Sequence, residues 1–171
     1  MCVSLVINSK YYTFGLIILL LSVQLAYGKE RGAVTNLPIP RYVSLKASKA
    51  NARRGPSLSH RIDWVFKRKK MPLELYGEYE NWRRVRDIDG AGGWVHYSLL
   101  SGSRTVILTV DMQPMLSSAS ANAMVIAMFE KGVVGEIEKC ELKWCLLSAA
   151  GYKGWVPKNA LWGVYPNEIK D

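Results

Sequence analysis

The segment from Trp82 to Arg86 holds the residues with the clearest binding chemistry in the chain. Val85 is its one apolar aliphatic residue, and in a strand the side chains of Trp82 and Val85 point to opposite faces. If Val85 points into a core, Trp82, Arg84 and Arg86 share the outer face. An indole beside two guanidinium groups can bind a peptide or a carboxylate by stacking, cation–π contacts and charge-assisted hydrogen bonds. The alternative is self-packing, with the arginine stems covering the indole.

A second candidate site is a run of four consecutive cations between the apolar residues Phe66 and Met71. These cations are Lys67, Arg68, Lys69 and Lys70. The run predicts an exposed loop, which either attracts an anionic partner or is a solvated loop that protects a sheet edge.

Two cysteines near the C-terminus, Cys140 and Cys145, are separated by four residues, which is the length of a hairpin loop with its first flanking pair. We predict a disulfide between them, worth roughly 2 kcal/mol because the ring it closes is small. A zinc site would need two more ligands, and both histidines, His60 and His96, lie far upstream. A redox pair more often has two residues between its cysteines.

Catalytic and metal-binding patterns are weak. The chain contains no Gly-x-Ser-x-Gly, His-Glu-x-x-His or phosphate-binding loop. Residues 87–90, Asp-Ile-Asp-Gly, resemble the start of a calcium loop, but Ser98 stands where the bidentate glutamate is needed, so a β-turn is predicted. The sequence therefore predicts no enzyme, no metal and no cofactor.

Composition limits the class of protein. The chain has 171 residues, 49% hydrophobic and 22% charged, which excludes a disordered acidic tail and a multi-span membrane protein. Its 14 glycines, 6 tryptophans and 9 tyrosines, among short apolar runs, favour an all-β fold. The net charge of +9 favours an anionic partner or surface. Residues 41–103 hold 13 Lys and Arg against 6 Asp and Glu, whereas residues 104–171 hold 7 of each.

The N-terminus has the pattern of a secretory signal peptide. Residues 14–23 are an apolar run of ten, too short for a spanning helix, which needs about 20 residues. Ala26 and Gly28 are small residues spaced as in a cleavage site, so we expect cleavage after Gly28 and a periplasmic or secreted protein. An uncleaved anchor is the alternative. Export would place the cysteines in an oxidising compartment, where a disulfide persists. It also argues against a nucleic-acid partner and favours anionic lipid or a wall polymer as the partner of the basic surface.

A repeat with an offset of about 62 residues runs through the chain. Residues 81–95 correspond to residues 143–156, and residues 71–75 correspond to residues 133–137. Each copy carries two tryptophans, the second within a Gly-Trp-Val triplet: Trp82 and Trp94 in the first copy, Trp144 and Trp155 in the second. We predict Trp94 and Trp155 to be core residues.

Each copy breaks into short segments bounded by turn residues, as in a small, partly open barrel. The first copy predicts strands over residues 62–66, 71–76, 82–87 and 92–95. Pro72 predicts that the second of these strands begins there or bulges. A helical turn at residues 96–100 and a returning strand at residues 105–110 are expected to follow.

The motifs of the first copy resemble those of the bacterial SH3-like domain family, in its exported, tandem, alphaproteobacterial form. The resemblance rests on residues 51–57, Asn-Ala-Arg-Arg-Gly-Pro-Ser, with residues 82–86 and 93–95, and it extends over roughly residues 38–166. The second copy departs from it, because Leu-Ser-Ser-Ala-Ser at residues 116–120 replaces the Arg-Arg-Gly-Pro-Ser of the first. The resemblance implies binding modules of the cell envelope, some of which recognise peptidoglycan or peptides, and it places a groove-lining tryptophan at Trp82.

The sequence thus predicts an all-β protein with two tandem SH3-like barrels: a signal peptide (1–28), a linker (29–40), domain 1 (41–103) and domain 2 (104–171). We expect a non-catalytic protein that binds cell-wall material or peptides; a scaffold that docks another envelope protein, or less readily a wall hydrolase, is the alternative. The predicted ligand-binding residues are Trp82, Arg84, Arg86, Tyr76, Tyr79, Lys67, Arg68, Lys69 and Lys70.

Overall fold

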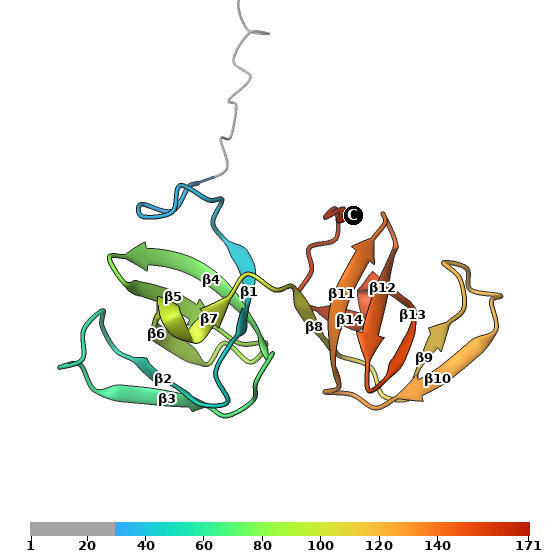
Figure 1. Cartoon of the computed structure of the whole chain (residues 1–171), viewed down its shortest axis with the longest axis horizontal. Helices are drawn as coiled ribbons and strands as arrows, with labels where there is room; N and C mark the ends of the chain where they lie inside the picture. The colour runs from blue at the N-terminus through green and yellow to red at the C-terminus, as the bar shows by residue number, and fades with distance from the viewer. Residues whose placement is uncertain (1–29) are drawn as a thin grey trace, which may run out of the picture.

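The computed structural model describes residues 30–171 (Figure 1). The predicted signal peptide lies outside the described residues. Within them, none of the helices has the length and apolar character needed to cross a membrane.

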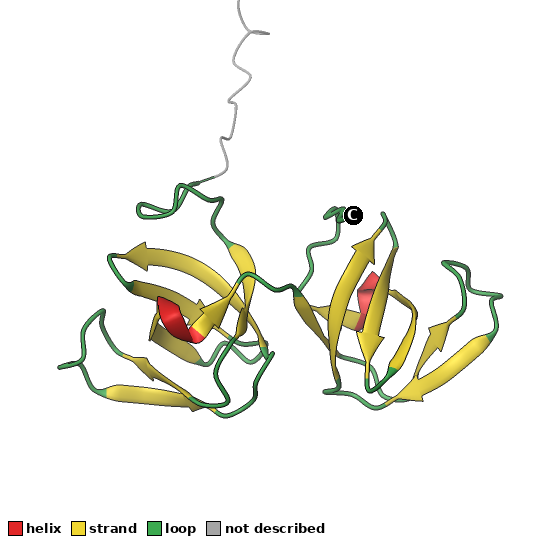
Figure 2. Cartoon of the chain, in the orientation of Figure 1, coloured by secondary structure: helices red, strands yellow, loops and turns green. Residues whose placement is uncertain are grey.

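The described chain folds into two seven-stranded antiparallel sheets, one for each copy of the repeat (Figures 1 and 2). The sheet of domain 1 has the order β3-β2-β6-β5-β4-β1-β7, and that of domain 2 has the matching order β10-β9-β13-β12-β11-β8-β14. Helical structure in residues 30–171 is limited to two short 3-10 turns, η1 (Tyr97–Leu99) and η2 (Lys158–Ala160). The prediction of an all-β fold with two tandem barrels is confirmed.

The strands of domain 1 are β1 (Arg41–Leu45), β2 (Ala50–Arg53), β3 (Ile62–Phe66), β4 (Pro72–Tyr79), β5 (Trp82–Arg86), β6 (Gly92–His96) and β7 (Leu100–Ser101). Those of domain 2 are β8 (Thr105–Leu108), β9 (Gln113–Leu116), β10 (Val125–Phe129), β11 (Val134–Cys140), β12 (Trp144–Ala149), β13 (Tyr152–Pro157) and β14 (Leu161–Trp162). As predicted, β4 begins at its proline, because a proline cannot donate a ladder hydrogen bond.

Turn residues end the strands where the sequence places them. The carboxylate of Asp87 accepts hydrogen bonds from the backbone of Asp89 and Ala91, and Gly90 has the positive φ that the turn requires. The β-turn predicted there is confirmed. In domain 2, Ala150 and Gly151 both have positive φ and close the hairpin between β12 and β13.

Each barrel has its own aliphatic core, and the tryptophans of the Gly-Trp-Val triplets are not in it. Val95 and Val156 are fully buried, whereas Trp94 and Trp155 are only half-buried. The prediction that these two tryptophans are core residues is wrong. Neighbours in a strand point to opposite faces, and the branched valine, which fits a narrow barrel, occupies the inner one.

The two cysteines occupy directly opposite positions on β11 and β12, and both are fully buried. They form the predicted disulfide. The bond removes both sulfurs from consideration as zinc ligands or thiolate nucleophiles.

Residues 30–40, within the segment that the sequence predicted to be a linker, fold back onto domain 1. Ile39 belongs to the core of domain 1, and the carboxylate of Glu78 accepts hydrogen bonds from the backbone of Val34 and Thr35 and from the Thr35 hydroxyl. Glu78 also pairs with Arg41 at 2.7 Å. Burial by itself would raise the pKa of Glu78, but these hydrogen bonds outweigh it and lower that pKa to about 2.

The two domains contact each other through side chains of both. The ring of Tyr42 in domain 1 packs against Trp162, at 5.2 Å between ring centroids, and against Tyr165, at 4.7 Å. The hydroxyl of Tyr165 donates a hydrogen bond to Glu74 at 3.0 Å. Burial and this hydrogen bond raise the pKa of Tyr165.

Candidate functional site

The arginines of β5 point outward, as the alternation predicts. Val85 is fully buried, and Arg84 and Arg86 are exposed. The guanidinium carbons of Arg84 and Arg86 lie 5.2 and 5.3 Å from the centre of the Tyr76 ring. Three of the predicted ligand-binding residues therefore form one cluster. Within it, Arg86 is also paired with Glu74 at 2.6 Å, which brings it to the edge of the domain junction.

Trp82 has a different environment from the one expected. Its side chain is only 8% exposed and contacts the ring of His96 edge-on, at 5.6 Å between ring centroids. Instead of an exposed platform beside Arg84 and Arg86, the indole forms part of the wall of a groove. The strand alternation correctly placed the Trp82 side chain on the face opposite Val85. It could not show that β2 and the turn after β6 lie beside the indole on this face.

We refer to this feature as the Trp82 groove, a hollow of about 320 Å³ between β2 and the β6–η1 segment. It combines an indole, an imidazole, an amide, aliphatic side chains and two cations. Its lining residues are Lys49, Ala50, Asn51, Arg53, Leu58, Trp82, His96 and Leu99.

The loop between β2 and β3 is held in place beside this groove by Arg53. One guanidinium nitrogen of Arg53 donates hydrogen bonds to the carbonyl oxygens of Leu58, at 2.9 Å, and of His60, at 2.7 Å. Gly55 allows the loop to close, because a Cβ at this position would lie 2.4 Å from the His60 ring. Both Arg53 and Gly55 belong to residues 51–57, the motif that carries the family resemblance. This motif therefore marked a segment beside the groove, although the sequence pattern did not predict that Arg53 lines it.

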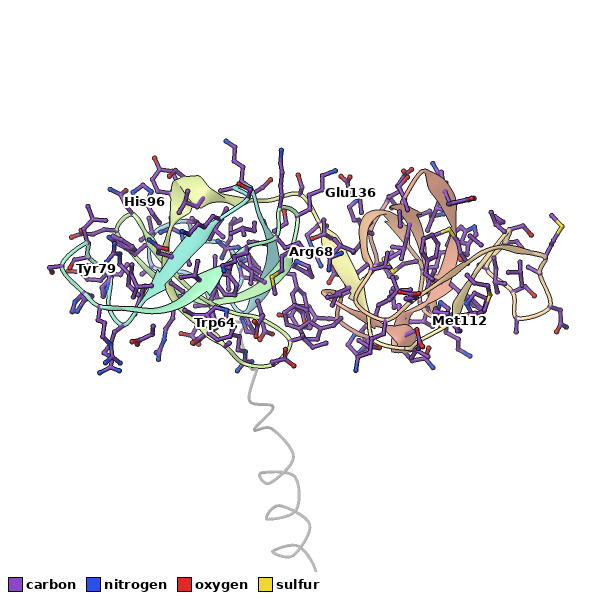
Figure 3. All side chains as sticks on the ribbon, turned by 90° about the horizontal axis from the view of Figure 1, so that it is seen from below. Trp64, Arg68, Tyr79, His96, Met112 and Glu136 are labelled. Carbon is purple, nitrogen blue, oxygen red and sulfur yellow. A yellow bond between two sulfur atoms is a disulfide. The ribbon has the colours of Figure 1, made fainter. Side chains whose placement is uncertain are left out.

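The four-cation loop lies at the domain junction. Arg68 donates a hydrogen bond to the carbonyl of Gly132 at 2.6 Å, and Lys70 pairs with Glu136. Figure 3 shows Arg68 facing domain 2, with His96 and Tyr79 toward the opposite end of domain 1. Two of the four predicted cations thus help to join the domains. Lys67 and Lys69 are exposed.

The outer cluster has a further member that the sequence reasoning assigned to the core. Trp94 is the Cα partner of Arg84 across β5 and β6, and its ring faces Gly77 on β4. Tyr79 is exposed and pairs with Trp82 in the β4–β5 register. The predicted residues are therefore distributed over the groove, the outer cluster and the junction, and they do not form one continuous patch.

Domain 2 has its own groove beside Trp144, the counterpart of Trp82, with a volume of about 570 Å³. Its lining is mainly aliphatic and proline, and the segment after β14 forms one side. Lys158 holds this segment by donating hydrogen bonds to the carbonyls of Pro166 and Glu168. The lining residues are Leu142, Lys143, Trp144, Pro157, Lys158, Asn159, Leu161, Val164 and Pro166.

The side chains that line the Trp82 groove are suited to binding a ligand. Within residues 30–171, no three His, Cys, Asp or Glu side chains are placed to hold a metal ion. His96 shares a hydrogen bond of 2.8 Å with the hydroxyl of Ser98, which places this imidazole in a fixed orientation at the groove wall. An indole wall with an adjacent amide and cationic rim can hold an extended chain that carries a carboxylate.

The chain was compared with known proteins. Two solved structures, NlpC2 and NlpC1 from Trichomonas vaginalis, are similar at 16% and 15% identity over 72% and 77% of this chain, each with a TM-score of 0.34. The chain spans about half the length of these structures, 48% in each case. No curated protein matches the sequence. The model of the bacterial SH3 domain matches twice, over residues 46–102 and 109–163, and the chain therefore belongs to the bacterial SH3 domain family.

Proposed function

We propose that this chain is an exported, non-catalytic binding protein of the cell envelope whose domain 1 binds peptidoglycan or its peptides in the Trp82 groove. The observation that carries the proposal is the lining of this groove, where Trp82 and His96 adjoin Asn51, Arg53 and Lys49. Bacterial SH3 domains commonly bind such ligands, and membership of the family supports the assignment.

The chemistry of the groove suits a peptide with free carboxylates. Indole and imidazole rings provide stacking surface, and the Asn51 amide can both donate and accept hydrogen bonds to a peptide backbone. Lys49 is exposed at the rim, where its ammonium group can meet a carboxylate. The excess of cations in residues 41–103 also attracts an anionic polymer to domain 1 rather than to the neutral domain 2.

Export is supported by the N-terminal pattern and by the disulfide of domain 2, because disulfides persist in oxidising compartments. The outer cluster of Tyr76, Arg84 and Arg86 is exposed and is a second point of contact for a long polymer.

The test is co-sedimentation of the purified chain with isolated peptidoglycan, followed by titration with free stem peptide. Trp82→Ala is a poor probe, because the indole is nearly buried and its removal would destabilise the barrel. Lys49→Glu and Leu58→Ser change exposed groove residues instead, and Leu58 is 76% exposed. We expect each to weaken binding by about tenfold, which corresponds to about 1.4 kcal/mol.

Matched controls are available on the same chain. Lys46→Glu makes the same charge change at an exposed lysine that does not line the groove, and Met124→Ser removes an apolar side chain from the equivalent hairpin of domain 2. Both should bind as the wild type does. If the groove variants bind peptidoglycan as strongly as the wild type does, the Trp82 groove is not the binding site.

The two alternative functions give different results in parallel assays. A scaffold protein would fail to sediment with wall material, yet crosslinking in intact cells would recover one dominant protein partner. A wall hydrolase would clear a peptidoglycan zymogram. A non-catalytic wall-binding protein sediments with the wall and leaves the zymogram intact.

A further inference from the structure

The strands β3 and β10 occupy equivalent positions at one end of their sheets. In the strand order of the described residues, β3 has β2 as its single neighbour, and β10 has β9. Each therefore presents one unpaired backbone edge, which is a template for pairing with another strand. The two edges differ in how their side chains protect them.

The edge of domain 1 is charged. Asp63 on β3 pairs with Arg54 at 3.1 Å and with Arg61 at 2.8 Å, and the four-cation loop follows the strand directly. Charges of this kind on an edge strand oppose pairing with another strand. A second copy of β3 placed alongside would bring like charges together.

The corresponding edge of domain 2 has lost this protection. Residues 123–129, Ala-Met-Val-Ile-Ala-Met-Phe, are seven consecutive uncharged residues, and Ile126 stands where domain 1 has Asp63. Three residues of β10 are large, apolar and exposed: Val125 at 51%, Ile126 at 39% and Met128 at 47%. An edge with high β-propensity, no charge and no proline pairs readily with another strand.

We propose that β10 is an interface between two copies of this chain, formed by antiparallel pairing of one β10 with the other. Self-pairing brings no charges together, and it covers exposed apolar side chains on both copies. Domain 2 as a whole has no net charge, so two such domains do not repel each other. The β9–β10 hairpin lies toward the end of domain 2 remote from domain 1, which keeps the two basic domains apart (Figure 1).

Sedimentation velocity of the purified chain over a range of concentrations tests this interface. The interface is one short strand pair, so we expect a weak dimer whose average mass rises from the 19.2 kDa of one chain toward twice that value with concentration. Ile126→Asp restores the residue type that protects β3 and should keep the chain monomeric. Met128→Lys is a second variant at an exposed position, and it should have the same effect.

Ile62→Asp is the matched control, since it adds the same charge to the edge of domain 1 at an exposed position. It should dimerise as the wild type does. A wild type that stays monomeric at every concentration would overturn the proposal, as would a dimer that survives both β10 substitutions or is lost in Ile62→Asp. The Trp82 groove is not part of this edge, so failure here leaves wall binding unaffected, and failure of wall binding leaves the dimer unaffected.

Discussion

The same cross-strand position is joined in two different ways in the two domains. In domain 1, Glu78 on β4 lies opposite Arg83 on β5, and the offset of 62 residues places Cys140 and Cys145 at the equivalent positions of β11 and β12. The buried charged pair of domain 1 thus corresponds to the disulfide of domain 2. The two domains therefore link the same pair of strands by different chemistry.

Each of these positions also contacts a segment that lies outside the barrel. Residues 30–40 fold over Glu78, whereas in domain 2 the backbone of Lys170 exchanges hydrogen bonds with that of Cys140. In domain 1 the segment that contacts β4 precedes the barrel in sequence. In domain 2 the segment that contacts β11, the equivalent strand, follows the barrel.

The two grooves differ in the same manner. The tryptophan keeps its place at the start of β5 and β12, but His96 of domain 1 corresponds to Pro157 of domain 2, each lying opposite the tryptophan. Both grooves include two cations and one asparagine, but domain 1 adds an imidazole beside its indole, whereas domain 2 adds two prolines. Duplication therefore preserved the frame and changed the ligand chemistry.

The largest expected effect comes from breaking the charged connection of domain 1. Glu78→Ala leaves Arg83 and Arg41 without their carboxylate and the amides of residues 34 and 35 without their acceptor. Removing one partner of such a buried pair costs roughly 3–5 kcal/mol in the free energy of unfolding. Urea unfolding measures this loss. Asp63→Ala, which removes two ion pairs with exposed arginines, should cost far less, because solvent screens such pairs, and equal losses in the two variants would contradict the assignment.

The pH dependence of stability should separate the two connections. The pKa of Glu78 is about 2 in the folded chain, below its ordinary value of 4.5, so its contribution is complete above pH 4.5 and is lost as the pH falls toward 2. The contribution amounts to roughly 3 kcal/mol. The disulfide of domain 2 does not titrate in this range. Calorimetry between pH 6 and pH 2 should show domain 1 losing stability first, and Glu78→Gln should flatten that loss.

A smaller loss than that of Glu78→Ala is expected from removing the disulfide. The replacement of both cysteines by alanine (C140A/C145A) opens a ring of only a few residues, so domain 2 should lose about 2 kcal/mol. Urea unfolding with and without reductant measures it. Wall binding by domain 1 should not change, and a larger loss in this variant than in Glu78→Ala would reverse the ranking of the two connections.

Much of the fold could be predicted because it depends on local patterns. The repeat offset, the glycine and proline turns and the strand alternation placed β3 to β6 within a few residues, and the cysteine spacing gave the disulfide. The strands β1 and β2 were not predicted; β1 pairs with β4, which is distant in sequence, so its partner gives no local signal.

The candidate site was predicted less well. Alternation correctly placed Val85 inside and Arg84 outside. It could not show that Trp82 is nearly buried beside β2, that Arg68 and Lys70 contact domain 2, or that Trp94 faces outward. Each of these facts depends on what another segment covers, and a period of two along one strand contains no such information.

The sequence by itself determined the duplicated all-β architecture, the excess of charge in the first copy and the pairing of Cys140 with Cys145. These follow from composition and from spacings within a few residues. Only the tertiary structure decided that Trp82 forms a groove wall, that residues 30–40 hydrogen-bond to Glu78 and that β10 is an apolar edge strand with one unpaired side. The physical reason is that burial depends on contacts between segments far apart in the chain, which close only when the whole sheet has formed.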